Sequence, residues 1–151
     1  MGRLSKFARL ASDERRLLAR GWTEVLLIRI ATWALPYGRV RAIVTRRAAE
    51  HGAATNARPD RDRIAWAVIT ASAYVPGGRN CLVRALAAEI VLRRFGYDGE
   101  LRIGIDRTLG GQFRAHAWLE SAGNPVIGDF ELDNYVALSA PDAITHQPRN
   151  I

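Results

Sequence analysis

The sequence predicts an α+β fold in which helices come first and a small antiparallel sheet follows. Two observations predict it. Apolar residues recur at helical spacing as far as about residue 95, and alternation of apolar and polar residues begins at residue 101. The 151 residues, 48% hydrophobic and 25% charged, suffice for one buried core and are typical of a globular domain.

The first predicted helix runs from Ser12 to about Leu35. Ser12 is a suitable cap, and Asp13 and Glu14 would lie at the positive end of the helix dipole. The helix should stop before Pro36, because the residue before a proline avoids helical backbone angles. One stripe of this helix carries Leu18, Trp22, Val25 and Arg29, flanked by Leu26, Ile30 and Trp33.

Two further helices are expected before residue 80. A more basic helix spans about residues 39–51 and ends at Gly52, and residues 52–59 have the composition of a linker. The next helix begins near Asp60 and must end at the Pro76-Gly77-Gly78 break. Its buried face is supplied by Ile64, Val68, Ala71 and Val75.

The fourth helix should be the centre of the fold. Asn80 can cap it, it spans Cys81 to about Phe95, and Gly96 closes it. Apolar residues surround most of its circumference, which is typical of a central helix rather than a surface one. These residues are Leu82, Val83, Leu86, Ala87, Ala88, Ile90, Val91 and Leu92.

Short strands are expected after the central helix. Residues 101–105 alternate between apolar and polar side chains, and residues 112–120 and 125–130 give a second and a third strand pattern. Residues 135–141 are a candidate fourth strand. The central helix would therefore feed a small antiparallel sheet.

The positive charge of the chain lies in its first half. Residues 1–80 hold 15 basic and 6 acidic residues, a balance of +9, whereas residues 81–151 hold 7 basic and 9 acidic residues, a balance of −2. We expect an N-terminal helical arm over residues 1–58, a core over residues 59–141 and a loose C-terminal tail over residues 142–151. No compact basic run is interleaved with aromatic residues, so nucleic-acid binding is not expected.

Cys81 is the only cysteine, which excludes an internal disulfide and a multi-cysteine zinc site. A single cysteine fits a reducing, cytoplasmic location. The most apolar stretch, residues 25–37, is too short to span a bilayer and contains Arg29. Acidic residues precede this stretch, unlike in a secretory signal. The sequence therefore predicts neither a membrane span nor a metal.

Cys81 is the candidate nucleophile. It lies at the start of the buried fourth helix, directly after the Pro-Gly-Gly break. Unpaired amides and partial positive charge at a helix N-terminus favour thiolate over thiol. The same amides can stabilise an oxyanion at an attacked carbonyl. The alternative interpretation is that Cys81 is a small buried hydrophobic residue.

His116 is the candidate base. Strand alternation places it on one face with Gln112, Arg114 and Trp118, while Ala117 and its apolar neighbours take the other face. The alternative interpretation is a histidine on the sheet surface, stacked beside Trp118. The spacing alone does not separate these two interpretations.

The hairpin that follows offers an acid to orient the imidazole. If the turn centres between Ala122 and Gly123, facing residue numbers sum to 245, so Trp118 faces Ile127 and His116 faces Asp129. Asp129 would then hold His116 in the correct tautomer. A register slip of one residue would break this pair, and the fallback acids are Glu131 and Asp133.

Cys81, His116 and Asp129, on a helix and then on a sheet, match the nucleophile–base–orienter order of papain-like and transglutaminase-like folds. The sequence also resembles the transglutaminase-like leader peptidases of lasso-peptide biosynthesis. The resemblance covers about residues 60–135. It depends on the runs Asn80-Cys81-Leu82-Val83-Arg84-Ala85-Leu86, Phe95-Gly96, Leu101-Arg102-Ile103-Gly104-Ile105 and His116-Ala117-Trp118-Leu119-Glu120.

This resemblance implies a cysteine peptidase that cleaves the leader from a ribosomally made precursor and needs no cofactor. An ATP-dependent cyclase then closes the freed core peptide. Some members of the family carry a fused leader-recognition domain, and the helical arm leaves no room for one here. The chain therefore resembles the split form, which works with a separate small leader-recognition protein. The cyclase is a further candidate partner.

The resemblance assigns the nucleophile to Cys81, the base to His116 and, less securely, the acid to Asp129. The Cys81 amide supplies one oxyanion donor, and Asn80 and Gln112 are candidates for the second. Trp118 is a candidate substrate-binding residue. Two rival functions share this core: an acyl transferase, in which an amine resolves the acyl-enzyme, and a non-catalytic adaptor.

The helical arm has two interpretations of its own. It can simply cover the sheet or the core of the fold. Alternatively, it can dock the recognition protein or the cyclase, with Trp22, Trp33 and Leu35 as apolar anchors and arginines around them. The +9 balance and the apolar run are the observations that motivate the second interpretation.

Overall fold

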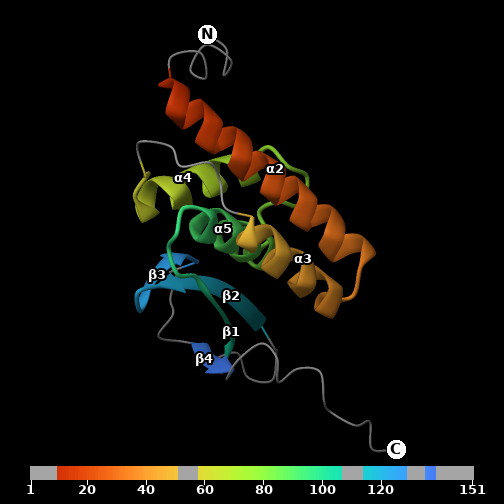
Figure 1. The fold of residues 1–151 in the computed structure, drawn as a ribbon. Coiled ribbons are helices and arrows are strands. Elements are labelled where there is room, and N and C mark those ends of the chain that lie inside the picture. Colours follow the sequence, from red (N-terminus) through yellow and green to blue (C-terminus); the bar gives the residue numbers. More distant parts are fainter. Residues whose placement is uncertain (1–9, 51–57, 107–113, 129–134, 139–151) are drawn as a thin grey trace, which may run out of the picture.

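The computed structural model describes residues 10–50, 58–106, 114–128 and 135–138, and it confirms the α+β prediction. The helices lie on one side of a small sheet (Figure 1). In chain order the helices are α2 (Ser12–Ala34), α3 (Tyr37–Ala49), α4 (Arg61–Ser72) and α5 (Cys81–Arg94). The strands are β1 (Glu100–Asp106), β2 (Arg114–Ser121), β3 (Asn124–Ile127) and β4 (Tyr135–Leu138).

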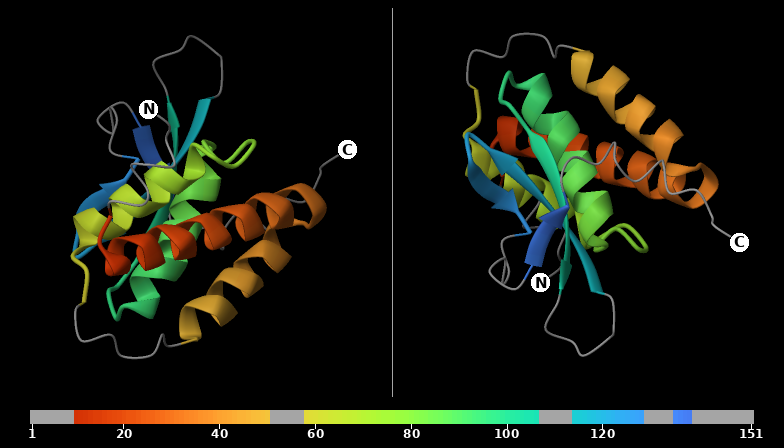
Figure 2. Two further views of the ribbon diagram at one scale, coloured as in Figure 1. Left: turned by 90° about the horizontal axis from the view of Figure 1, so that it is seen from above. Right: turned by 90° about the horizontal axis from the view of Figure 1, so that it is seen from below.

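The sheet has the strand order β3-β2-β1-β4, and each neighbouring pair is antiparallel. The two views of Figure 2 show the strands crossing beneath the helices. On one face of the sheet, Leu101 of β1 pairs with Leu119 of β2, and Ile103 pairs with Ala117. These side chains belong to the hydrophobic core, so this face packs against the helices.

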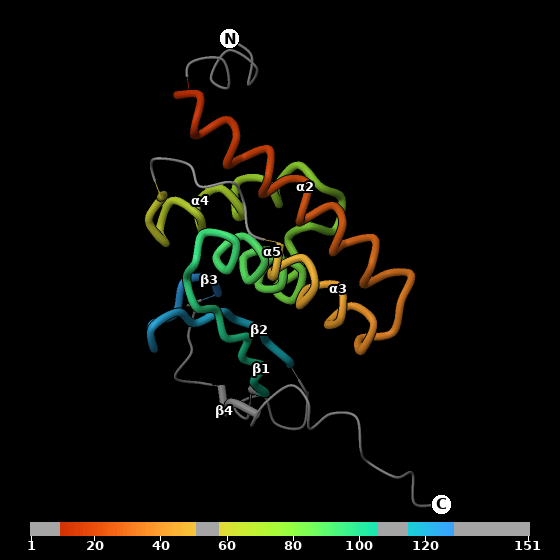
Figure 3. The backbone as a smooth tube through the Cα atoms, viewed as in Figure 1, coloured from red at the N-terminus to blue at the C-terminus, as the bar shows by residue number. Residues whose placement is uncertain are grey.

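Helix α5 is the central helix, as its apolar circumference predicts. Every residue from Ala85 to Leu92 is buried. The helix contacts α2, α3 and α4 on its outer sides and β1, β2 and β3 on its inner side. Figure 3 lets the chain be followed from α4 through a tight loop into α5 and on into β1. The first residue of α5 therefore lies at one end of the core.

The helix ends differ from the sequence prediction in three places. Helix α2 is capped by Ala11 rather than Ser12, because the Glu14 carboxylate accepts a hydrogen bond from the Ala11 amide at 3.3 Å. Helix α3 begins directly after Pro36, whose fixed φ suits a helix start. Helix α4 ends at Ser72, and hydrogen-bonded turns carry the chain on to the glycine break.

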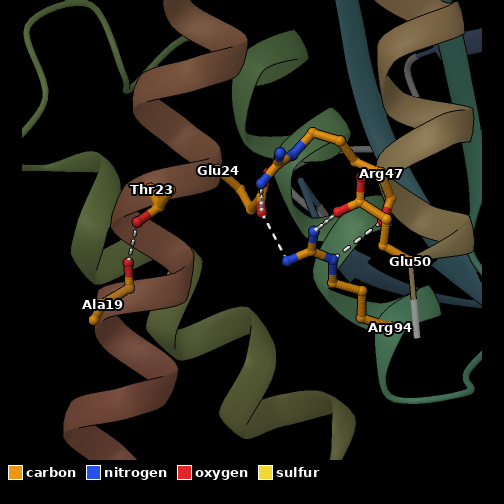
Figure 4. A network of polar contacts seen from close by, with 6 residues as sticks. All are labelled: Ala19, Thr23, Glu24, Arg47, Glu50 and Arg94. Atoms are coloured by element: carbon orange, nitrogen blue, oxygen red, sulfur yellow. Dashed lines mark hydrogen bonds and ion pairs between the residues drawn. The ribbon is translucent and has the colours of Figure 1, made fainter. Parts of the chain in front are cut away.

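Two buried carboxylates tie the helices together. Glu24 of α2 is 1% exposed and binds Arg47 of α3 at 2.7 and 2.8 Å and Arg94 of α5 at 3.1 Å (Figure 4). Glu89 of α5, also 1% exposed, binds Arg41 of α3 at 2.6 Å. Helices α2, α3 and α5 are thus joined by charge-assisted hydrogen bonds as well as by apolar packing. Within the described ranges, no helix has the length and apolar character needed to cross a membrane.

Candidate active site

The start of α5 is held by the cap that the sequence predicts. The Asn80 Oδ1 atom accepts hydrogen bonds from the amides of Leu82 at 2.9 Å and Val83 at 3.4 Å. These bonds satisfy two of the otherwise unpaired amides in the first turn. The cap does not engage the amide of Cys81. That amide therefore stays the first-turn donor best suited to an oxyanion. The cap uses only the Oδ1 atom of Asn80, and the candidate second donor is its Nδ2 group.

The loop before Cys81 is shaped by two glycines. Gly77 has a φ of 72°, a value that favours glycine. A Cβ on Gly78 would lie 2.8 Å from the Ser72 carbonyl oxygen, so the chain passes too close to α4 for a side chain there. The Pro-Gly-Gly break thus has a specific role: it lets the chain leave α4 and enter α5 within a few residues.

Arg29 of α2 holds this loop from outside. Its Nε atom donates a hydrogen bond to the Pro76 carbonyl oxygen at 3.2 Å. Its guanidinium occupies the space beside Gly77, where a Cβ would lie only 2.3 Å from Nε. The predicted helical arm therefore contacts the segment that leads to Cys81. The domain boundary at residue 58 itself stays a prediction.

Cys81 is the first residue of α5, and its side chain is half-buried against the edge of the hydrophobic core. Arg84 follows one turn later and donates from Nε to the hydroxyl of Ser72 at 2.9 Å. Burial lowers the pKa of Arg84 below its ordinary value, the charge of Arg79 lowers it further, and Cys81 raises it. Arg84 thus follows Cys81 by three residues on α5, and its guanidinium is anchored on α4.

His116 lies on β2 with its ring against that of Trp118. The ring centroids are 6.2 Å apart and the planes differ by 18°. Trp118 is 5% exposed, and its indole N–H donates to a Glu120 carboxylate oxygen at 2.9 Å. Opposite His116 on β1 is Gly104, which has no side chain. The stacking with Trp118 that the alternative interpretation of His116 expects is therefore present, and the catalytic role of His116 stays a prediction.

The Nε2 atom of His116 lies 2.8 Å from the carbonyl oxygen of Gly128. A carbonyl oxygen can only accept, so Nε2 is the donor and carries a proton. In the neutral ring, Nδ1 is then the nitrogen that can take up a proton. Sequence reasoning missed this partner, since it looked for a side-chain acid. Gly128, inside the predicted strand over residues 125–130, was the one local signal of a close backbone approach.

The hairpin register is partly as predicted. The turn centres on Ala122 and Gly123, both with positive φ, and Glu120 pairs with Pro125 as expected. The predicted Trp118–Ile127 pair is wrong, because Ile127 pairs with Leu119. An irregularity opposite Leu119 and Glu120 inserts one extra residue in β3 and shifts the register by one.

Gly128 approaches β2 closely just beyond this irregularity. Its φ is 85°, and a Cβ there would lie 3.0 Å from both the Ala117 carbonyl oxygen and the Trp118 Cβ. Only glycine fits this position without strain. The bulge and the glycine together bring a main-chain carbonyl to the imidazole of His116.

Cys81 and His116 lie at the same end of the helix–sheet packing. Strand β1 returns along α5, and β2 is antiparallel to β1, so β2 runs in the same general direction as α5. Gly99 lies beside Glu89 of α5 and Leu119 of β2, because a Cβ built on this glycine would be 3.6 and 3.8 Å from the two side chains.

From Gly99, both Cys81 and His116 lie toward the N-terminal ends of their own elements, α5 and β2. Cys81 lies about 12 Å back along the helix, at 1.5 Å per residue. His116 lies about 10 Å back along the strand, at 3.3 Å per residue. Both views in Figure 2 show α5 and β2 beginning at the same end. His116 projects from the sheet face opposite the core, whereas Cys81 borders the core on the helix side.

The remaining candidates differ in what the structure says of them. Asn80 is the helix cap, and Trp118 is a buried wall beside His116. Gln112, Asp129 and the fallback acids Glu131 and Asp133 lie outside the described residues. In the part of the chain that is described, no group of three or more His, Cys, Asp or Glu side chains could hold a metal ion.

Comparison with known proteins agrees with this architecture. The family model of the transglutaminase-like superfamily matches residues 25–140, which is more than half of the chain and includes both Cys81 and His116. No curated protein and no solved structure matches the chain. A helix that begins at the one cysteine, packed on an antiparallel sheet that carries the histidine, is the arrangement expected of such a core. The chain belongs to the transglutaminase-like superfamily.

Proposed function

We propose that this protein is a cytoplasmic cysteine peptidase that removes the leader peptide from a ribosomally made lasso-peptide precursor. The observation that carries the proposal is Cys81, set at the capped start of a buried helix in a chain of this superfamily. A thiol at a helix N-terminus is favoured as thiolate, which is the form that attacks a carbonyl. The resemblance of the Cys-Leu-Val-Arg-Ala and His-Ala-Trp runs supports the substrate class.

The reaction would proceed through an acyl-enzyme. The Cys81 sulfur attacks the carbonyl carbon at the leader–core junction, and the Cys81 amide stabilises the oxyanion. For the proton to move, the His116 ring and the Cys81 sulfur have to meet at the end of the sheet that they share. The ring then takes the thiol proton and returns it to the leaving amine, which frees the core peptide. Water then attacks the thioester, releases the leader as a carboxylic acid and restores the thiol. Asp129 would stabilise the imidazolium.

Mass spectrometry of a lasso-type precursor incubated with the protein tests this proposal. The reaction is run with and without a separate leader-recognition protein. We expect one cut, at the leader–core junction, either in both mixtures or only when that protein is present. Cys81→Ala should retain the fold, checked by circular dichroism, and give no cut. His116→Ala should give a cut slowed by at least about a hundredfold, the usual contribution of a general base. Cleavage by folded Cys81→Ala would refute the proposal.

The same experiment separates the two rival functions. Acyl transfer differs from hydrolysis only in the group that resolves the thioester, so a small primary amine added to the reaction tests for it. An amine adduct on the leader that forms in preference to the free acid would identify an acyl transferase. Binding of the precursor with neither product would favour a non-catalytic adaptor.

We further propose that the separate recognition protein docks on the outer face of α2 and α4. The large hydrophobic side chains that are exposed among the described residues all lie on these two helices and the turn after α4. They are Trp22, Ile30, Trp33, Trp66, Ile69 and Tyr74. Leu35, a further predicted anchor, packs against the core instead.

Two of the tryptophans flank one side of the contact between α2 and α4. The helices are parallel, since Glu14 binds Arg63 near one end and Arg29 binds the chain after α4 at the other. At their crossing, a Cβ on Gly21 would lie 3.2 Å from the Ala67 carbonyl oxygen.

Successive residues of a helix are rotated by about 100° around its axis. In two parallel helices, the residue that follows the contact residue of one helix therefore points to the same side as the residue that precedes the contact residue of the other. Trp22 follows Gly21 and Trp66 precedes Ala67. The two indoles are 45% and 41% exposed. A pair of exposed aromatic anchors in a basic half of the chain fits a partner with an apolar and acidic face.

Titration calorimetry with the recognition protein tests this surface. We expect Trp22→Ala and Trp66→Ala each to weaken binding by about tenfold or more, as aromatic interface anchors do. Thr45→Ala, an exposed change on α3, is the matched control and should bind normally. Wild-type affinity in both tryptophan variants would refute the surface and leave the peptidase proposal standing.

A further inference from the structure

We propose that Arg84 is a positioning residue that holds a fixed positive charge beside the Cys81 sulfur and so favours the thiolate. The inference rests on the proposed nucleophilic role of Cys81. It gives a role to Arg84, the fourth residue of the Cys-Leu-Val-Arg-Ala run. Neither the helix cap nor the proposed triad uses this residue. Three observations support it: the spacing on α5, the anchor on α4 and the missing acidic partner.

The spacing on α5 brings the two side chains together. Arg84 follows Cys81 by three residues, and residues so spaced are neighbours on a helix, with Cβ atoms roughly 5–6 Å apart. Side chains on a helix tilt toward its N-terminus. The long Arg84 side chain therefore extends back over the first turn, where the sulfur lies.

The anchor is a buried serine at the end of α4. The Ser72 side chain is fully buried, and its hydroxyl donates to the Ile69 carbonyl oxygen at 2.7 Å. Its single proton is thus used, and the oxygen accepts the hydrogen bond from the Arg84 Nε atom at 2.9 Å. The arginine stem is fixed at Nε, which leaves the two terminal nitrogens of the guanidinium for another negative group.

Four other arginines that pack between the helices have acidic partners. Arg41 and Arg93 bind Glu89, and Arg47 and Arg94 bind Glu24. In the described part of the chain, Arg84 has no carboxylate within ion-pair distance. The negative group on its own helix that it can stabilise is the Cys81 thiolate.

The two neighbouring charged groups act on the Arg84 guanidinium in opposite directions. Burial and the charge of Arg79 lower the pKa of Arg84, whereas Cys81 raises it, as expected when thiolate and guanidinium attract each other. Arg29, held on the loop by the Pro76 carbonyl, adds a further positive charge from α2. His116 of β2 is the titratable group that the mechanism brings to the sulfur.

The pH dependence of thiol alkylation by iodoacetamide tests the inference without any peptide substrate. In wild-type protein the rate rises as the thiolate forms. We expect Arg84→Met to move the midpoint of this rise upward by about one pH unit, so that alkylation well below the midpoint slows about tenfold. Arg84→Lys, which keeps the charge, should recover part of the shift.

Two further variants separate charge from folding. Ser72→Ala keeps the Arg84 charge but removes its anchor, so we expect a smaller shift in the same direction. Arg46→Met removes an exposed arginine from the last turn of α3 and should leave the alkylation profile unchanged. All variants are compared by circular dichroism at each pH, so that unfolding is recognised.

An unchanged midpoint in folded Arg84→Met would overturn the inference, as would a shift of equal size in Arg46→Met. Equal shifts in Arg84→Met and Arg84→Lys would assign the effect to packing rather than charge, and would overturn it too. Precursor cleavage is scored separately. Absence of cleavage by the wild-type protein counts against the proposed function. A midpoint of alkylation that is the same in all variants counts against the role of Arg84 alone.

Discussion

The Glu24 carboxylate provides the most stringent test of how the helical layer is held together. It is 1% exposed and faces two guanidinium groups, whose side chains are 22% exposed at Arg47 and 13% exposed at Arg94. Glu24→Gln is nearly isosteric, so it removes the negative charge and leaves the shape. The two arginines would then be partly buried without the anion that they share.

The expected loss is about 3 kcal/mol in the free energy of unfolding. Breaking a buried ion pair from one side costs roughly 3–5 kcal/mol. The lower end applies here, because the partners keep some contact with water. For a chain of this length, such a loss corresponds to a fall of about 10 °C in melting temperature. It is a large fraction of the roughly 5–15 kcal/mol that stabilises a domain.

Urea unfolding followed by circular dichroism measures this loss, with Glu50→Gln as the control. Glu50 binds the same Arg94 at 2.8 Å, but its side chain is 56% exposed, so its removal should cost less than about 1 kcal/mol. A loss under 1 kcal/mol in Glu24→Gln would refute the reasoning, as would equal losses in the two variants.

The result should not depend on pH near neutrality. The hydrogen bond to Glu24 raises the pKa of Arg47 above its ordinary value. A group whose pKa is raised on folding contributes its stability fully below the unfolded value and loses it only as pH rises through the folded value. From this group we therefore expect no change in stability between about pH 6 and pH 9.

Three other variants test the hairpin and the helix cap. Asn80→Ala should destabilise the protein by about 1 kcal/mol in urea unfolding, because the first-turn amides of α5 lose their acceptor. Gly128→Ala should cost about 2 kcal/mol and shift the His116 ring resonances in NMR spectra, since its Cβ would meet β2 at 3.0 Å. Hydrogen bonds from Ala122 and Ser121, together with the charge of Arg61, lower the pKa of Asp98. Its stabilising effect is present above the ordinary value of 3.8 and is lost as pH falls through the folded value, so Asp98→Asn should differ from wild type at pH 6 and converge with it in acid.

The helices could be predicted from the sequence because each carries its own signal. The continuous apolar circumference of α5 and the Asn80 cap are local properties, and both predictions are confirmed. The contacts that join the helices are not local. Nothing near Glu24 in the sequence indicates that it is buried, since its two arginine partners lie 23 and 70 residues away in the chain. A buried carboxylate and an exposed one have the same appearance in a sequence.

The hairpin shows where prediction of the site stopped. Its two-residue turn was predicted from residue type, because Ala122-Gly123 follows one strand pattern and precedes another. The bulge beyond the turn could not be predicted, because the inserted residue, Val126, is apolar like Ile127 beside it. The placement of Cys81 and His116 at one end of the fold thus follows from the order of the helices and strands. The partner of the imidazole depends instead on the one-residue register shift in β3.

That shift changes what the proposed acid has to do. With the Gly128 carbonyl on Nε2, the tautomer of His116 is set by a main-chain group that does not titrate. In the proposed mechanism the proton of the Cys81 thiol would then be taken up by Nδ1. Asp129 would stabilise the imidazolium once the proton has moved.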